Sequence, residues 1–293
     1  MPSLTVAGAA PGRNVDTMDD RLHRAAWGTE PGMWPLPAAS TVRERWDRAV
    51  ALGGQGRYLA ASAELDAAAL SGPVPPSLRS QMYSTRASWI RQRGVHSAAA
   101  RVDGTAIAAV GLDERSSPSG EDGNEAAVVR ARADALVGLA ADALGVGRFG
   151  TADALLTRCE HIVARDGRED VLWRQHLRLG WVRAELAMFS GKGPDAVRHA
   201  LDARGRADEI DSLRHIVKTD LVLAAAYSSV GDLSRSGDGA QRVLDACEVH
   251  GLLPLRWAAA MLWSGVGGGA AAQSVARECE AELARRGGRF TAV

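Results

Sequence analysis

The sequence predicts an all-α fold of about six antiparallel helix hairpins. Two observations lead to this prediction: a spacing of small residues that recurs along the chain, and an apolar content carried largely by alanine. Hydrophobic residues make up 46% of the 293 positions, whereas aromatic residues make up only 5%. This balance favours closely packed helices, because strands prefer β-branched and aromatic side chains. No segment shows the sustained two-residue alternation of a half-buried strand.

The recurring pattern is a small residue, a glycine seven positions later, and a second small residue five positions beyond the glycine. A small residue on each of two helices lets their axes approach closely. The glycine ends the first helix, because glycine adopts the left-handed cap conformation without steric cost. The six copies are Ala49-Gly56-Ala61, Ala87-Gly94-Ala99, Ala140-Gly147-Ala152, Ala184-Gly191-Ala196, Ala224-Gly231-Ser236 and Ala260-Gly267-Ala272.

In the first and third copies an aromatic residue, Tyr58 or Phe149, follows the glycine and opens the second helix. With this spacing the chain resembles the tetratricopeptide repeat (TPR) family, whose repeats are pairs of antiparallel helices. The resemblance implies a right-handed superhelix, a TPR-like α-solenoid that acts as a binding scaffold. The glycines are farther apart than the family period of about 34 residues, so the array is divergent. The alternative is a chance pattern in a chain rich in alanine and glycine.

The pattern divides the chain into segments. We expect two hairpins before an acidic loop and four after it, flanked by a flexible N-terminal arm and a short tail. The arm contains Trp27 and Trp34, which we expect to cap the first hairpin; docking on a partner is the alternative. The expected segments are 1–40 (arm), 41–111 (two hairpins), 112–125 (loop), 126–286 (four hairpins) and 287–293 (tail).

Charge and composition exclude several classes of function. The 35 basic and 35 acidic residues give a formal net charge of zero, which argues against direct nucleic-acid binding. Nearly all positive charge is arginine, which is typical of a high-GC bacterial genome. We expect no signal peptide, no membrane span and a cytoplasmic location. Three sparse cysteines predict buried free thiols and no disulfide framework.

Motifs that carry chemistry are weak or absent. The glycines at 145, 147 and 150 form GxGxxG, but a long helical pattern precedes them, whereas a dinucleotide site follows a strand. Cys247 and His250 lie one helical turn apart, without a second pair of metal ligands. We therefore expect no cofactor, no metal and no catalytic residues, and predict that the protein is not an enzyme.

The resemblance also implies candidate binding residues, because the first helix of each TPR hairpin lines the concave face. The predicted function is a non-catalytic protein–protein interaction scaffold or regulatory adaptor, which holds a peptide or helix of a protein partner in a groove. The alternative is a ligand-sensing helical-repeat domain of a regulatory system, and an enzyme is less favoured. An open groove supports the first and a closed pocket the second. For the aromatic candidates, a place in the core between hairpins is the alternative. The candidates are Arg43, Gln81, Ser84, Ser88, Arg91, Trp181, Glu185, Met188, Phe189, Trp257 and Met261.

Overall fold

A computed structural model describes residues 18–112 and 125–288. Every regular element in this part of the chain is an α-helix, so the all-α prediction is confirmed there. The expected acidic loop, apart from its ends, and residues 1–17 and 289–293 lie outside the described residues. The helices are α1 (Met18–Trp27), α2 (Val42–Gly54), α3 (Tyr58–Leu70), α4 (Pro76–Gln92), α5 (His96–Val110), α6 (Glu125–Gly145), α7 (Phe149–Asp166), α8 (Trp173–Phe189), α9 (Gly193–Ala207), α10 (Leu213–Ser229), α11 (Leu233–Val249), α12 (Leu253–Gly265) and α13 (Gly269–Arg285).

From α2 onward the helices pack as successive pairs, each turned at a glycine of the recurring pattern. Those glycines have φ between 70° and 112°, the left-handed region in which a side chain is strained. Every small residue of the pattern is at most 2% exposed. Alanine therefore occupies the crossing of each pair, as its spacing predicts. The handedness of the superhelix stays a prediction.

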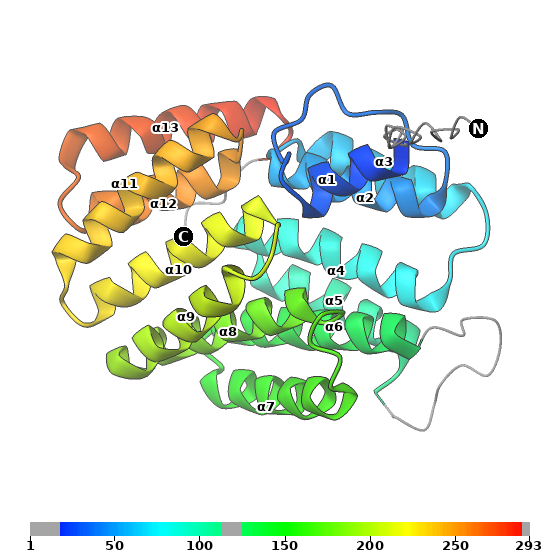
Figure 1. Cartoon of the computed structure of the whole chain (residues 1–293), viewed down its shortest axis with the longest axis horizontal. Helices are drawn as coiled ribbons and strands as arrows, with labels where there is room; N and C mark the ends of the chain where they lie inside the picture. The colour runs from blue at the N-terminus through cyan, green and yellow to red at the C-terminus, as the bar shows by residue number, and fades with distance from the viewer. Residues whose placement is uncertain (1–17, 113–124, 289–293) are drawn as a thin grey trace, which may run out of the picture.

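The pairs stack so that their first helices adjoin one another. Contacts run from α2 to α4, α4 to α6, α6 to α8, α8 to α10 and α10 to α12 (Figure 1). The second helix of each pair packs against its own first helix. This arrangement gives the molecule an inner wall made of the even-numbered helices.

The predicted flexible arm differs from the structure over residues 18–40. Leu22, Ala25 and Ala26 of α1 are at most 1% exposed and belong to the core of the first hairpin. Ala25 and Ala26 follow Leu22 by three and four residues, so all three lie on one face of α1, and this face packs against α2. The following loop is fixed by Gln55, whose Nε2 donates to the carbonyl oxygens of Pro31 and Met33 at 2.9 and 3.0 Å.

The first and last hairpins meet. Nη1 of Arg286 donates to the backbone carbonyl oxygen of Gln55 at 2.7 Å. A Cβ added at Gly56 would lie 2.5 Å from a methyl group of Leu283, a fully buried side chain that belongs to the core of the first hairpin. Figure 1 shows α12 and α13 beside α2 and α3. The array therefore curls into a closed ring.

The loop after α1 makes a second contact across the closure. The backbone N–H of Leu213 donates to the carbonyl oxygen of Gly28 at 3.2 Å. A Cβ at Gly32 would lie 2.6 Å from the His250 carbonyl oxygen, so the loop fits against the turn after α11 only with glycine there. The segment that contains Trp27 thus covers the first hairpin and also joins it to the hairpin of α10 and α11.

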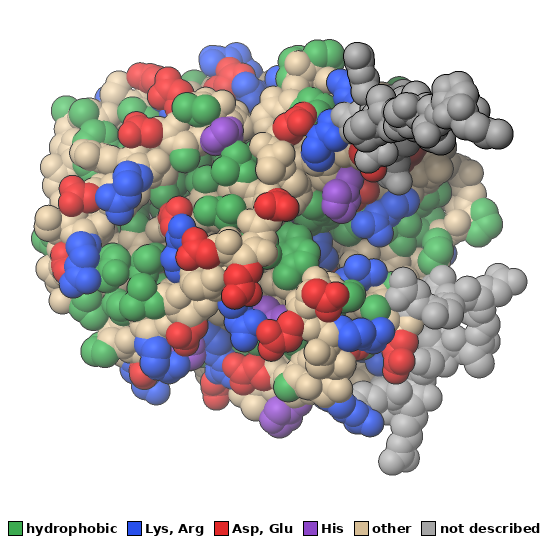
Figure 2. Space-filling view, viewed as in Figure 1, with side chains coloured by type: hydrophobic (Ala, Val, Ile, Leu, Met, Phe, Trp, Pro, Cys, Tyr) green, Lys and Arg blue, Asp and Glu red, His purple; other side chains and the backbone are tan. Residues whose placement is uncertain are grey.

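Basic and acidic side chains are interspersed over the face of the molecule in Figure 2. This face has no continuous basic stripe of the kind that binds nucleic acid. Within the described residues, no helix combines the length and the apolar character that crossing a bilayer requires. All three cysteines are buried and free, as their sparse spacing predicts.

Candidate functional site: a pocket inside the ring

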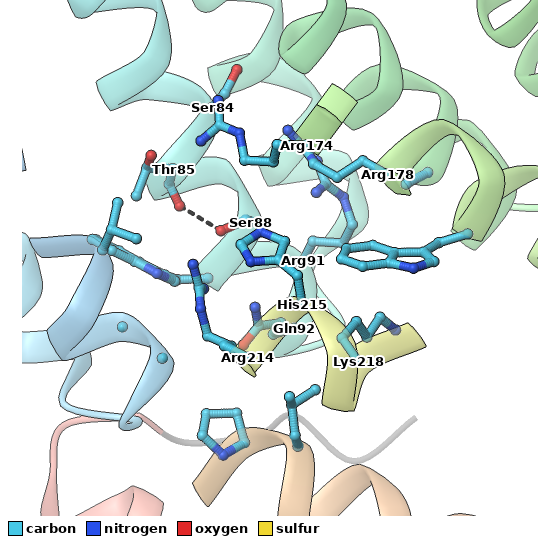
Figure 3. Close-up of a pocket in the computed structure, with 18 of the residues that line it drawn as sticks. Ser84, Thr85, Ser88, Arg91, Gln92, Arg174, Arg178, Arg214, His215 and Lys218 are labelled. Carbon is cyan, nitrogen blue, oxygen red and sulfur yellow. Dashed lines mark hydrogen bonds between the residues drawn. The ribbon is translucent and has the colours of Figure 1, made fainter. Parts of the chain in front are cut away.

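A pocket of about 410 Å³ lies inside the ring. Each even-numbered helix from α2 to α12 contributes side chains to its wall, and α1 contributes Trp27. In Figure 3, labelled polar side chains from α4, α8 and α10 converge on this space. Because one helix of every hairpin lines it, the pocket depends on closure of the ring.

Most of the residues predicted for the concave face lie in this wall, on α4, α8 and α12. The repeat positions place them there because residues three and four apart share one face of a helix. Trp181 also packs among buried residues of α9 and α10, so it is both core and lining. The predicted residues that line the pocket are Gln81, Ser84, Ser88, Arg91, Trp181, Glu185 and Trp257.

The remaining four predicted residues lie elsewhere. Phe189 and Met261 are 67% and 48% exposed, and neither lines the pocket. Met188 packs against the alanine-rich contact between α8, α9 and α10. Arg43 lines an adjoining hollow of about 740 Å³, which shares Trp27, Trp46, Gln81 and Arg174 with the pocket.

Two basic lining residues, Arg174 and Arg214, were not predicted to lie on the concave face. Arg174 precedes Arg178 by one turn on α8, and Arg214 precedes Lys218 by one turn on α10. The four-residue spacing was a usable signal, because it extends the predicted face of each helix. Trp27 had no such signal, since it reaches the pocket only through the packing of α1 on α2.

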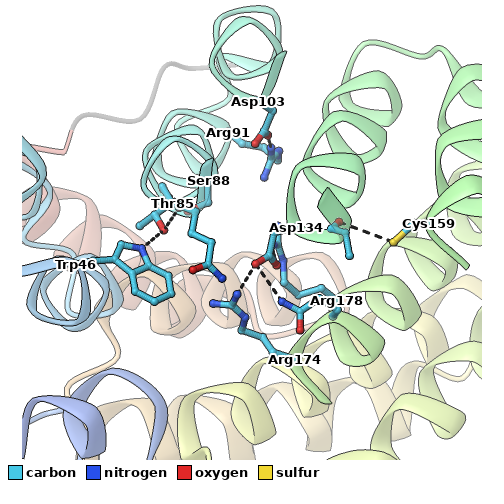
Figure 4. Close-up of polar contacts among 12 residues, drawn as sticks. Trp46, Thr85, Ser88, Arg91, Asp103, Asp134, Cys159, Arg174 and Arg178 are labelled. Atoms are coloured by element: carbon cyan, nitrogen blue, oxygen red, sulfur yellow. Dashed lines mark hydrogen bonds and ion pairs between the residues drawn. The ribbon is translucent and has the colours of Figure 1, made fainter. Parts of the chain in front are cut away.

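Asp134 anchors two of the arginines. Its Oδ1 accepts from Arg178, and its Oδ2 accepts from Arg174 and, at 3.1 Å, from Nε2 of Gln175 (Figure 4). The carboxylate is almost fully buried in the wall. One carboxylate thus holds two guanidinium groups in fixed positions. The three side chains together carry a net charge of +1.

Arg91 belongs to a separate buried network. Its Nε donates to Oδ1 of Asp142 at 2.7 Å, and its Nη2 donates to Asp142 at 3.2 Å and also to Asp103. Burial raises the pKa of Asp103 to about 7, against the pull of the Arg91 charge. A Cβ at Gly138 would lie 2.2 Å from a carboxylate oxygen of Asp103. Glycine at this position of α6 therefore leaves room for the Asp103 carboxylate. Arg91 is therefore paired within the wall.

Aromatic rings form the part of the wall next to the arginines of α8 and α10. The ring of His215 stacks on Trp181 with centroids 5.8 Å apart and on Trp27 at 6.1 Å. Nδ1 of His215 shares a hydrogen bond of 2.7 Å with the hydroxyl of Ser212. Burial and the nearby arginine charges, Arg214 foremost, hold the His215 pKa well below its ordinary value. The imidazole is therefore neutral at physiological pH.

No family model matches the sequence, and no curated protein matches it. Matching solved structures include two crystal structures of nearly identical TPR-like repeats from a putative kinesin light chain of Podosopora anserina, one of them a single-substitution variant. Each is 18% identical in sequence to this chain. The variant matches over 73% of this chain and 100% of its own, with a TM-score of 0.43; the other structure matches over 72% and 97%, with a TM-score of 0.42.

The fold is TPR-like. Three features of the structure support this description: helices in successive pairs, buried alanines where the helices cross, and glycines with left-handed φ at the turns. The likeness to the kinesin light chain repeats says nothing about what this chain binds. The GxGxxG motif is part of the same architecture, because Gly147 forms the turn between α6 and α7.

Proposed function

We propose that this TPR-like ring is a non-catalytic ligand-binding domain, which holds a small molecule in its central pocket. The observation that carries the proposal is the contact between the first and last hairpins, since it brings the two ends of the inner wall together around one pocket. A volume of about 410 Å³ is within the range of small-molecule sites. A regulatory system in which binding stabilises the closed ring is the role that fits such a domain.

The interaction-scaffold function that the resemblance implies remains the second candidate. It is favoured by exposed apolar side chains on the outside of the ring, such as Leu70 and Val249, which are 87% and 77% exposed. A scaffold of this kind would use the outer surface.

A test needs a neutral apolar probe and a variant that fills the pocket. N-phenyl-1-naphthylamine fluoresces when it enters an apolar cavity and carries no charge. We expect one molecule to bind per wild-type chain. Ala258→Trp adds a large ring to the pocket wall and should weaken binding at least tenfold. Ala271→Trp, at an exposed position on α13, is the matched control and should bind normally.

The opposite results would refute the proposal. If the probe fails to bind the wild-type chain, or binds equally well to Ala258→Trp, the pocket does not receive ligands. Capture of a protein partner whose binding is unaffected by Ala258→Trp and abolished by changes to Leu70 or Val249 would favour the outer surface and the scaffold function instead.

A further inference from the structure

The corner of the pocket between α8 and α10 carries more positive than negative charge. Arg174, Arg178 and Arg214 all line it, and Asp134 is the acidic lining residue that pairs with the first two. The guanidinium carbons of Arg174 and Arg214 lie 4.6 and 5.7 Å from the centroid of the same ring, that of Trp27. This corner thus contains three cationic side chains and one carboxylate.

Arg214 has no acidic partner among the described residues. Its Nη2 donates to the carbonyl oxygen of Ala26 at 3.2 Å, which positions the guanidinium but does not neutralise it. A Cβ at Gly54 would lie 3.0 Å from Cδ of Arg214, so α2 leaves space for the arginine stem. Burial, together with the charges of Arg174 and Arg178, lowers the pKa of Arg214 to about 10. The fold therefore holds a charge that an anion would stabilise.

The other cations that line the pocket are already paired. Nζ of Lys218 lies 3.4 Å from Oε1 of Glu185, so those two residues form a pair of their own. Arg91 is likewise paired with Asp103 and Asp142. The unmatched charge is therefore localised at Arg214 and its two arginine neighbours, where guanidinium N–H groups suit the oxygens of a carboxylate, phosphate or sulfonate.

Flat, uncharged surfaces lie next to this cationic corner. The indole N–H of Trp181 donates to Oγ1 of Thr219 at 2.9 Å, and that of Trp27 donates to Oδ1 of Asp47 at 2.6 Å. Their polar atoms are thus occupied by the protein. His215 stacks between the two rings and is neutral. The indole rings of Trp27 and Trp181 both line the pocket and offer apolar surface to the body of a ligand.

We propose that the ligand of this pocket is a small organic anion with a flat apolar body. Its anionic group binds Arg214, with Arg174 and Arg178 beside it, and its body packs on the indole rings of Trp27 and Trp181. The inference rests on the proposed ligand-binding function and adds the chemical class of the ligand.

Two fluorescent probes that differ by one anionic group test the inference. 1-Anilinonaphthalene-8-sulfonate carries a sulfonate that N-phenyl-1-naphthylamine lacks. Because a hydrogen bond to a charged group contributes about 1.5–3 kcal/mol, we expect the sulfonate to bind roughly ten- to a hundredfold more tightly. Arg214→Gln should abolish that preference while leaving the neutral probe bound. Arg198→Gln removes one charge at an exposed position on α9 and should leave the preference unchanged.

The controls separate the possible failures. Equal affinity of the wild-type chain for both probes, or a preference that survives Arg214→Gln, overturns the anion inference but leaves the ligand-binding function intact. If neither probe binds, the proposed function itself fails. If Arg214→Gln unfolds, two further experiments decide: the Arg214→Lys variant, and competition of sulfate with the probes on the wild-type chain. Each should weaken binding of the sulfonate probe and leave binding of the neutral probe unchanged. A sulfonate affinity unchanged in both would contradict the proposal.

Discussion

Nη1 of Arg286 lies 2.7 Å from the carbonyl oxygen of Gln55, a residue 231 positions earlier in the chain. This hydrogen bond joins the end of the last hairpin to the turn of the first. It spans the junction at which the superhelix becomes a ring. Without that junction the inner wall would be an open groove.

Arg286→Ala should destabilise the ring by about 1.5–3 kcal/mol, the value of a hydrogen bond that involves a charged group. Its neighbour Arg285 provides a matched control, because both arginines pair with Glu282 but only the Arg286 side chain donates to Gln55 of the first hairpin. Urea unfolding of Arg285→Ala should therefore give a loss below about 1 kcal/mol. Equal losses in the two variants would mean that the junction contributes nothing.

The glycines at 147 and 150 should respond in opposite directions to alanine. Both have open space around an added Cβ, but only Gly147 has a positive φ, of 75°. Gly147→Ala should cost about 1–2 kcal/mol through backbone strain. Gly150→Ala, within α7, should gain up to about 1 kcal/mol, because it lowers the entropy of the unfolded chain. Thermal unfolding of both variants checks this, and two losses of similar size would contradict the turn assignment.

Arg91 should be far more important for stability than its exposed neighbour Arg86 on the same helix. Arg91→Met leaves Asp103 and Asp142 buried without their cation, which should cost about 3–5 kcal/mol at pH 8. Arg86→Met breaks a solvent-exposed pair with Asp66 and should cost under about 1 kcal/mol.

The loss in Arg91→Met should shrink at pH 5, since unpaired buried carboxyl groups take up protons. Urea titrations at both pH values measure the difference. A loss in Arg91→Met no larger than in Arg86→Met, or one that grows on acidification, would contradict the network.

His215 makes stability depend on pH. Its pKa is depressed in the folded state, so the unfolded chain binds the proton more readily below pH 6.5, and the free energy of unfolding should fall as pH falls from 7 to 5. The slope reaches about 1.4 kcal/mol per pH unit for one such group. His215→Asn should reduce the slope of unfolding free energy against pH by up to that amount. Identical slopes of unfolding free energy against pH in the two proteins would show that His215 takes up its proton as readily in the folded as in the unfolded chain.

The sequence was sufficient to predict the helices and their turns because both depend on local chemistry. Ala49 and Ala61 flank Gly56 at the spacing that a hairpin crossing needs, and both are fully buried. The packed helix α1 was missed because Gly, Pro and Ala around it outweighed a short apolar face at Leu22, Ala25 and Ala26. Its stability comes from packing against α2, which the local sequence does not encode.

The position of the candidate pocket could be predicted from the sequence, but its shape could not. Gln81, Ser84 and Ser88 fell on the pocket wall because the repeat fixes which face of a first helix is concave. Closure of the ring depends on the twist accumulated over successive hairpins, so the contact between Leu283 and the first hairpin carries no local signal. The unmatched charge of Arg214 likewise emerges only when α10 is placed beside α1.

The most direct measurement of ring closure is an engineered disulfide between the two ends. A Cβ at Gly287 lies 2.5 Å from that of Leu59, and the native cysteines are buried, so Leu59→Cys with Gly287→Cys should oxidise to an intramolecular bond after a small backbone shift. The control, Leu70→Cys with Gly287→Cys, moves one thiol along α3 by about 17 Å and should stay reduced. Mass spectrometry of the oxidised proteins decides: a cross-linked monomer for the first pair alone supports the closed ring, whereas free thiols in both pairs mean that the array is open.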